Sequence, residues 1–169
     1  MLSAIVFDAS RSLSREWSRS FLAEFEKNCN KIRGFFNVIY ARQGIPLSPR
    51  AMLLRDAIKI LEEAPFLPGS SDPYAGVREL VEILKGKMIN EIIIIWSMSK
   101  RPRLPFAFAF TLARSLGAQY IALITPRAYL PRWIDSYLGD IVDEETFELI
   151  SRAGKQRARL LAEKLGCKI

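Results

Sequence analysis

The order of hydrophobic and polar positions along the chain predicts strands that alternate with helices. Nearly continuous apolar runs, typical of strands covered on both faces, occur at Leu2–Phe7 and Glu91–Trp96. Elsewhere apolar residues such as Trp17, Phe21 and Phe25 recur at helical spacing and form a stripe along one helix face. This alternation favours a mostly parallel sheet with helices on both faces.

Helix caps and chain breakers complete the set of predicted elements. Ser14 and the pair Ser48-Pro49 are suited to begin helices, and Gly117 is suited to end one. We expect one domain, residues 1–169, with a doubly wound α/β fold and its most hydrophobic strand, Glu91–Trp96, at the centre. The predicted strands are Leu2–Phe7, Phe35–Ala41, Glu91–Trp96, Gln119–Ile124 and Ile141–Val142. The predicted helices are Ser14–Ile32, residues 48–64, Tyr74–Lys85, Pro105–Leu116, Arg127–Leu138 and Glu144–Leu165.

Composition narrows the class of protein. The chain has 169 residues, 50% of them hydrophobic and 25% charged, and this balance predicts a globular protein with a hydrophobic core. No apolar run approaches the roughly 20 residues that cross a bilayer, and the N-terminus lacks the pattern of a secretion signal. Cys29 and Cys167 have no metal-binding or redox spacing. We expect a cytoplasmic protein, and its many Lys, Arg and Glu beside few Asn, Gln and Cys are typical of thermophiles.

Charge narrows the possible partners and reactions. The net charge of +7 and the isoelectric point near 9.6 favour anionic partners: an acidic protein surface, nucleic acid or phosphate. Small basic domains without such partners are also common. The chain contains no histidine, which excludes histidine general bases, Ser-His-Asp triads and zinc sites built on imidazole.

Hard oxygen donors gather at two points that the predicted fold brings to one edge of the sheet. Asp8, Ser10 and Ser12 follow the first strand, and Ser71 and Asp72 directly precede a helix. Carboxylate and hydroxyl oxygens are the donor types that Mg²⁺ prefers, and open α/β sheets bind ligands at the carboxyl ends of their strands. The same residue types also serve as ordinary turn and cap residues.

These motifs resemble those of von Willebrand factor A domains. The sequence DASRS at residues 8–12 matches the DxSxS motif of that family, and GSSD at residues 69–72 is similar to its GGTD-type loop. The third motif of the family is an aspartate in a TDG-like sequence after the central strand. Here that strand ends in WSMS at residues 96–99, so Ser97 or a neighbour stands in place of the aspartate. The order of elements resembles the family over most of the chain.

The resemblance implies a metal-ion-dependent adhesion site for Mg²⁺ or Mn²⁺. Ser10 and Ser12 would bind the ion directly, Ser71 directly or through water, and Asp8 directly or by orienting waters. The loss of the third aspartate either increases the ion's demand for a carboxylate from a partner or leaves the site without metal, and the sequence leaves both open. The implied site consists of Asp8, Ser10, Ser12, Ser71, Asp72 and Ser97.

Basic residues follow several predicted strands and would form a rim around this site. They are Arg11, Arg15, Lys100, Arg101, Arg103 and Arg127. A cationic rim favours an acidic protein partner whose binding weakens as salt increases. The alternative is ordinary solvated loop charge.

Two other functions remain open from sequence. A Mg²⁺-dependent nuclease of PIN or NYN type, acting on RNA, would use Asp8 and Asp72 with Asp140, Asp143 or Glu144, but it gives the serine hydroxyls no role. A scaffold domain without metal would work with a larger machine such as an ATPase. Its apolar contact patch would be Trp96, Met98, Pro102 and Phe106, although such residues more often belong to the core. The sequence favours a binding module over an enzyme, and an acidic protein partner over nucleic acid.

Overall fold

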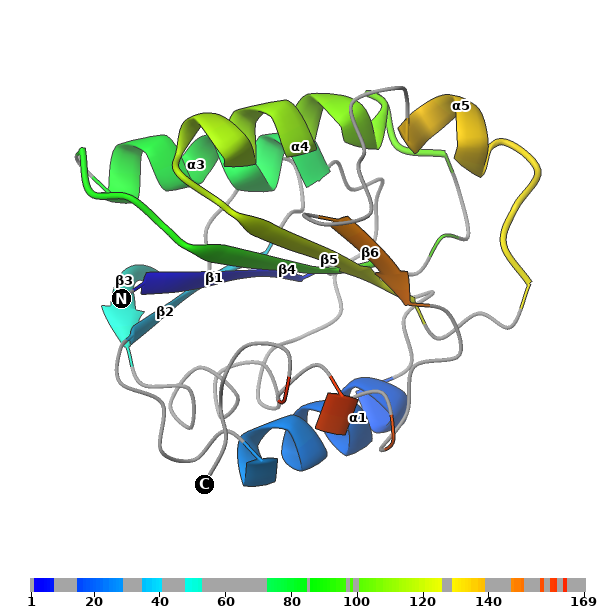
Figure 1. Ribbon diagram of the computed structural model, residues 1–169, viewed down its shortest axis with the longest axis horizontal. Coiled ribbons are helices and arrows are strands. Elements are labelled where there is room, and N and C mark those ends of the chain that lie inside the picture. The colour runs from blue at the N-terminus through cyan, green and yellow to red at the C-terminus, as the bar shows by residue number, and fades with distance from the viewer. Residues whose placement is uncertain are drawn as a thin grey trace.

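The chain folds around one mixed sheet that lies between two layers of helices (Figure 1). The computed structural model describes residues 2–7, 15–28, 35–40, 48–52, 73–84, 86–96, 98, 101–125, 129–138, 147–150, 156, 159–160 and 163. The sheet has six strands in the order β3-β2-β1-β4-β5-β6, and every neighbouring pair is parallel except β2–β3. The predicted α/β fold with a mostly parallel sheet is confirmed.

The bounds of the elements match many of the predicted ranges. The strands are β1 (Leu2–Phe7), β2 (Phe35–Tyr40), β3 (Ser48–Met52), β4 (Glu91–Ile95), β5 (Tyr120–Ile124) and β6 (Phe147–Ile150). The helices are α1 (Arg15–Asn28), α3 (Pro73–Leu84), α4 (Phe106–Ser115) and α5 (Ile134–Leu138). None of the described helices is both long and apolar enough to cross a membrane.

Strand β4 lies at the centre of the sheet because its side chains are apolar on both faces. It pairs with β1 on one side and β5 on the other, and Ile92–Ile95 are at most 1% exposed. All five residues of β5 are buried as well. A parallel sheet covered by helices requires such continuous apolar strands, so the predicted central position of this strand is confirmed.

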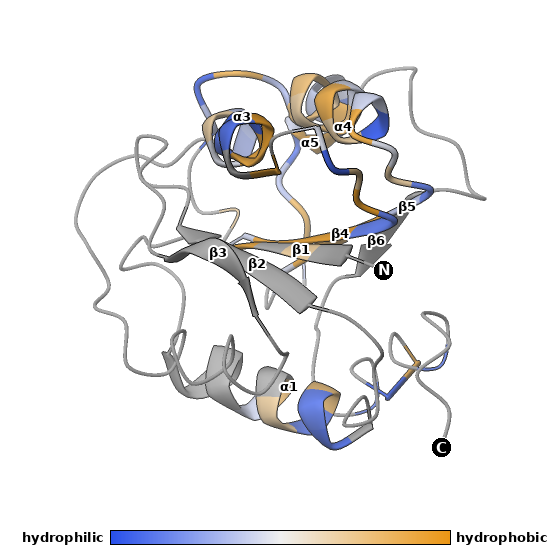
Figure 2. Cartoon of the chain, turned by 90° about the vertical axis from the view of Figure 1, so that its left-hand side faces the viewer, coloured by the Kyte–Doolittle hydropathy of each residue, from blue (hydrophilic) through white to orange (hydrophobic). Residues whose placement is uncertain are grey.

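Helices cover both faces of the sheet. Figure 2 shows α3 and α4 end-on above the sheet and α1 below it. The predicted stripe of α1 is buried at Phe21 and Phe25, which are 1% and 0% exposed. Above the sheet, α4 buries Phe106 and Phe110. Each helix therefore places its apolar side against the sheet.

The end of α4 follows a Schellman motif. The N–H of Gly117 donates to the carbonyl oxygen of Arg114, and the N–H of Ala118 donates to that of Ala113. Gly117 has a φ of 98°, a left-handed conformation that glycine adopts readily. The predicted role of this glycine as the helix stop is confirmed.

Two predicted helices are wrong where the structure has strands. Residues 48–52 form β3, antiparallel to β2, and not the start of a helix. Residues 147–150 form β6, parallel to β5, and not part of the helix Glu144–Leu165. In both places hydrogen bonding to a strand distant in sequence outweighs the local helical pattern. Further along, Gln156, Arg159, Leu160 and Glu163 are helical.

The predicted helix Arg127–Leu138 is correct only over α5, because residues 129–133 precede the helix as turn and loop. The predicted strand Ile141–Val142 and residues 53–64 of the predicted second helix lie outside the described residues. The C-terminal segment is joined to α1 by an ion pair in which Arg159 Nε lies 2.6 Å from Glu24 Oε1. Glu24 is 8% exposed, so the ion pair satisfies a largely buried carboxylate on α1.

Candidate functional site

The carboxyl ends of β1 and β4 form the switch point of the sheet. These two strands are neighbours, and Phe7 is paired with Ile95 at their ends. The chain leaves β1 for α1 on one face of the sheet and leaves β4 for α4 on the other face (Figure 2). Such a divergence opens a crevice outside the strand ends, which is where open α/β sheets bind ligands.

The described strand and helix ends bracket all three sequence motifs. The DASRS motif begins directly after Phe7, the WSMS sequence begins directly after Ile95, and Asp72 directly precedes Pro73 of α3. Only residues 85–90 link α3 to the amino end of β4, so the first turn of α3 lies toward the carboxyl edge. The implied metal ligands themselves, Asp8, Ser10, Ser12, Ser71, Asp72 and Ser97, lie outside the described residues.

The segment after β4 has an unusual backbone. The N–H of Trp96 donates to the carbonyl oxygen of Ile124 at 2.9 Å, which extends the contact between β4 and β5 by one residue. Met98 then has a φ of 63°. Few residues other than glycine adopt this left-handed conformation, and it costs an L-residue about 1–2 kcal/mol. Met98 is fully buried, so packing holds it there.

The four residues that a metal-free scaffold would use as an apolar contact patch belong to the interior, as is more often the case for such residues. Trp96 is 2% exposed, Met98 and Phe106 are 0% exposed, and Pro102 is also buried. Phe106 packs against Phe110, Trp133 and Tyr137 with ring centroids 6.3–6.5 Å apart. These side chains belong to the core because the connection after β4 folds under α4 and α5.

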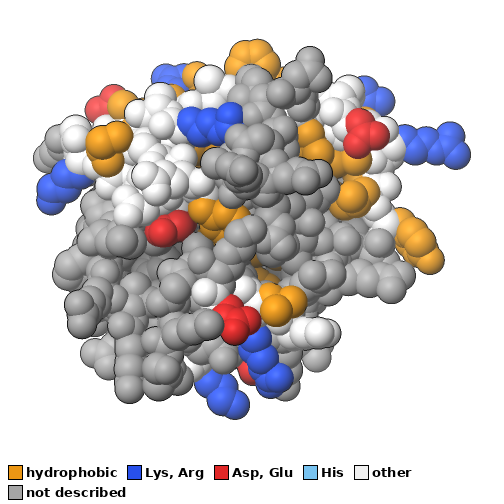
Figure 3. Space-filling model, viewed as in Figure 1, with side chains coloured by type: hydrophobic (Ala, Val, Ile, Leu, Met, Phe, Trp, Pro, Cys, Tyr) orange, Lys and Arg blue, Asp and Glu red, His pale blue; other side chains and the backbone are white. Residues whose placement is uncertain are grey.

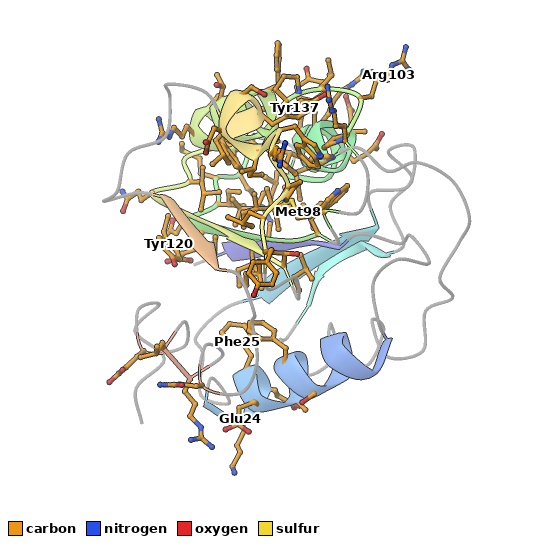
Figure 4. All side chains as sticks on the ribbon, turned by 90° about the vertical axis from the view of Figure 1, so that its right-hand side faces the viewer. Glu24, Phe25, Met98, Arg103, Tyr120 and Tyr137 are labelled. Carbon is orange, nitrogen blue, oxygen red and sulfur yellow. The ribbon has the colours of Figure 1, made fainter. Side chains whose placement is uncertain are left out.

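The described residues of the predicted basic rim lie on two different segments. Arg101 and Arg103 are exposed on the connection between β4 and α4, and Arg15 is the first residue of α1. Figure 4 shows Arg103 projecting from the outer side of the helix layer, whereas Met98 lies between that layer and the sheet. Arg11, Lys100 and Arg127 lie outside the described residues.

A hollow on the outer side of α4 was missed by the reasoning from sequence. It has a volume of about 380 Å³, and its described lining residues are Tyr74, Ala107, Phe108, Thr111, Leu112 and Ser115. The sequence FAFAF at residues 106–110 carries a signal for it. Side chains two residues apart on a helix point in nearly opposite directions, so three alternating phenylalanines cannot all face the core. Phe106 and Phe110 are buried, and Phe108 is 53% exposed.

Comparison with known proteins identifies the fold but finds no match by sequence. No family model and no curated protein sequence matches the chain. Among solved structures, the SpRpn10 VWA domain has a TM-score of 0.61 and 10% identity, and the match covers 99% of this chain and 96% of that one. Proximal thread matrix protein 1 from the mussel byssus has a TM-score of 0.63 and 16% identity, with coverage of 98% of this chain and 45% of that one. These matches span nearly the whole chain and, at such low identity, reflect the fold. The protein therefore has the fold of a von Willebrand factor A domain, as its DASRS motif predicted.

Proposed function

We propose that the chain is a protein-interaction module, not an enzyme, that binds an acidic partner through Mg²⁺ or Mn²⁺ at the carboxyl edge of β1 and β4. The observation that carries the proposal is the position of the DASRS motif in this fold. It begins directly after Phe7, where β1 ends beside Ile95 of the central strand. At this switch point a parallel α/β sheet presents residues to a ligand.

The donor set fits a hard divalent cation. Asp8, Ser10, Ser12 and Ser71 offer carboxylate and hydroxyl oxygens, the donor types of Mg²⁺ sites. The set contains few negative charges, so a bound ion keeps much of its positive charge and attracts a carboxylate from the partner. The role of the chain is to hold the ion and to leave one coordination position open for that carboxylate.

The backbone of Met98 supports Ser97 as the residue in place of the third aspartate. In a TDG-like sequence a glycine follows the aspartate, and glycine adopts positive φ readily. Met98 has a positive φ of 63° and would therefore stand at the glycine position. Ser97 then occupies the aspartate position and removes one negative charge from the site.

Titration of the protein with Mn²⁺ tests the metal site directly. We expect weak binding by isothermal titration calorimetry, and we expect the heat of binding to disappear in the double variant Ser10→Ala/Ser12→Ala. Ser115→Ala is a matched control, because its hydroxyl donates to the carbonyl oxygen of Leu112 on α4. Equal binding by wild type and double variant would contradict the proposal.

A crystal grown in Mn²⁺ gives an independent test. We expect a metal peak within about 2.5 Å of the DASRS oxygens, because bonds from such hard ions to oxygen are about 2.0–2.1 Å long. Metal-dependent cleavage of RNA that is lost in Asp8→Asn would replace the proposal with the nuclease function. Absence of a peak at saturating Mn²⁺ would leave the fold without its proposed adhesion chemistry.

A further inference from the structure

The outer side of the upper helix layer carries an aromatic pair, in which Phe108 is exposed and Tyr74 is half-buried against the core. Phe108 on α4 packs edge-on against Tyr74 on α3, with ring centroids 6.3 Å apart and an interplanar angle of 85°. Both rings line the hollow of about 380 Å³ on α4. The volume lies within the range of about 300–1,000 Å³ that is typical of ligand pockets.

Phe108 is not part of the core side of α4. The core side of α4 consists of Phe106, Ala109, Phe110 and Ala113, all at most 1% exposed. Phe108 points away from that side and keeps 53% of its surface in solvent. Burying such a side chain is worth about 1.5–3 kcal/mol, and half of that gain is left unused in the isolated chain.

The hydroxyl groups in the hollow do not make it polar. Thr111 Oγ1 donates to the carbonyl oxygen of Ala107 at 2.9 Å, and Ser115 Oγ donates to that of Leu112 at 2.6 Å. Both donors are satisfied within α4, so a partner can cover them without supplying an acceptor. The hollow therefore suits apolar side chains.

Positive charge flanks the hollow. Arg78 lies one helical turn after Tyr74 and, at 3.6 residues per turn, about 40° from it around α3. Arg103 precedes α4 and projects from the outer side of the helix layer (Figure 4). Both are exposed, and neither forms an ion pair with a described side chain. Figure 3 shows hydrophobic side chains beside Lys or Arg side chains along the top of the molecule, where Figure 1 places α3 and α4.

Acidic groups on α3 oppose this charge only in part. Glu79 lies about 140° around the helix from Tyr74, and the exposed Glu82 lies about 80° from it. Arg78 thus lies nearer to Tyr74 around α3 than either glutamate does. Aromatic residues and arginine are also the types enriched at the centres of protein interfaces.

We propose that this hollow docks an amphipathic helix of a partner protein, with large apolar side chains on one face and Asp or Glu beside them. The apolar side chains enter the hollow against Phe108 and Leu112, and the carboxylates meet Arg78 and Arg103. An amphipathic helix that lays its apolar face into a hydrophobic groove is a common mode of peptide recognition. This surface lies on the outer side of α3 and α4, so its binding does not require the metal site.

Selection from a random library tests the identity of the occupant. Peptides of about 15 residues, long enough to form a helix on binding, are selected against the full-length chain in EDTA. We expect binders with Leu, Phe or Trp at spacings of three and four residues and an excess of Glu and Asp. A library without binders, or binders that are neutral or basic, would overturn the proposal.

Variants at the surface then locate the binding. Phe108→Ser should weaken the selected peptides by about 100-fold, a loss typical of an interface hot spot. The pair Arg78→Gln/Arg103→Gln should weaken them by about tenfold and should remove most of the salt dependence. Met88→Ser is the matched control, because Met88 is 62% exposed on the connection between α3 and β4.

Three results separate this proposal from its rivals. Binding that survives Phe108→Ser would place the peptides elsewhere and overturn the proposal. Self-association of the chain that is lost in Phe108→Ser, measured by light scattering, would make the occupant a second copy and also overturn it. Peptide binding that is unchanged in Ser10→Ala/Ser12→Ala would support it. This variant removes the proposed metal ligands and leaves the hollow intact, so it shows that the hollow binds independently of the metal site.

Discussion

The two ends of β4 carry left-handed backbone on different residue types. Near the amino end, positive φ falls on Gly86 at 88° and on Gly117 at 98° in the adjacent connection. At the carboxyl end it falls on Met98, whose side chain is fully buried. Glycine adopts this conformation without penalty, whereas methionine does not. The difference shows that the amino end uses glycine where the backbone is left-handed, whereas at the carboxyl end the packing of a buried side chain holds the strained backbone.

The largest expected effect comes from removing the side chain that anchors the carboxyl end. Trp96 is 2% exposed, so Trp96→Ala leaves a large cavity and should lower the free energy of unfolding by about 3–5 kcal/mol. Ile89→Ala at the amino end also empties a fully buried site and should cost less, about 2–4 kcal/mol. Urea unfolding measures both. A smaller loss at Trp96 than at Ile89 would mean that the carboxyl end is the more loosely packed one.

Replacement of Met98 tests the strain itself. Met98→Ala should cost about 2–4 kcal/mol, because it removes a buried side chain and keeps the strained backbone. Met98→Gly removes the same side chain and relieves the strain, so it should be more stable than the alanine variant by about 1 kcal/mol. At an ordinary position in a strand or helix the order is reversed. Thermal unfolding of the pair decides, and a less stable glycine variant would show that the carboxyl end is unstrained in solution.

The smallest expected effects come from the two glycines at the amino end. A Cβ at Gly117 would lie 2.7 Å from Met88 Cε and 3.0 Å from the carbonyl oxygen of Ile89, whereas a Cβ at Gly86 would meet nothing within 4 Å. Gly117→Ala should therefore cost about 2 kcal/mol and Gly86→Ala about 1 kcal/mol. Chemical denaturation of both variants measures the difference. Equal losses would mean that close packing around Gly117 adds nothing to the backbone effect.

The centre of the sheet is predictable from sequence, and its edges are not. Strands β1, β4 and β5 are continuous apolar runs, because helices cover both of their faces. The edge strands lack that pattern. Ser48-Pro49 has the signature of a helix start, and Phe147–Ile150 follows acidic residues typical of a first helical turn. Their strand conformation depends on pairing with β2 and β5, which local sequence does not encode.

Some features of the candidate site could likewise be predicted from sequence, and others could not. The DASRS motif, together with the GSSD loop and the order of elements, predicted the fold that the structural comparisons bear out. The left-handed backbone of Met98 left no trace in the sequence, because methionine does not favour positive φ. The exposed ring of Phe108 could have been predicted from the alternating phenylalanines of FAFAF, since one helix face cannot hold all three.

The irregular edge strand β3 has a consequence for aggregation. An open sheet edge is a template for strand addition by other chains, and proline, bulges and short length are the features that blunt it. Strand β3 contains Pro49, which lacks a backbone N–H, and its register against β2 shifts between Asn37 and Val38. At the other edge, the described part of β6 has four residues. Both edges of the sheet are therefore poor templates for added strands of other chains. Association with a partner would then use surfaces formed by side chains.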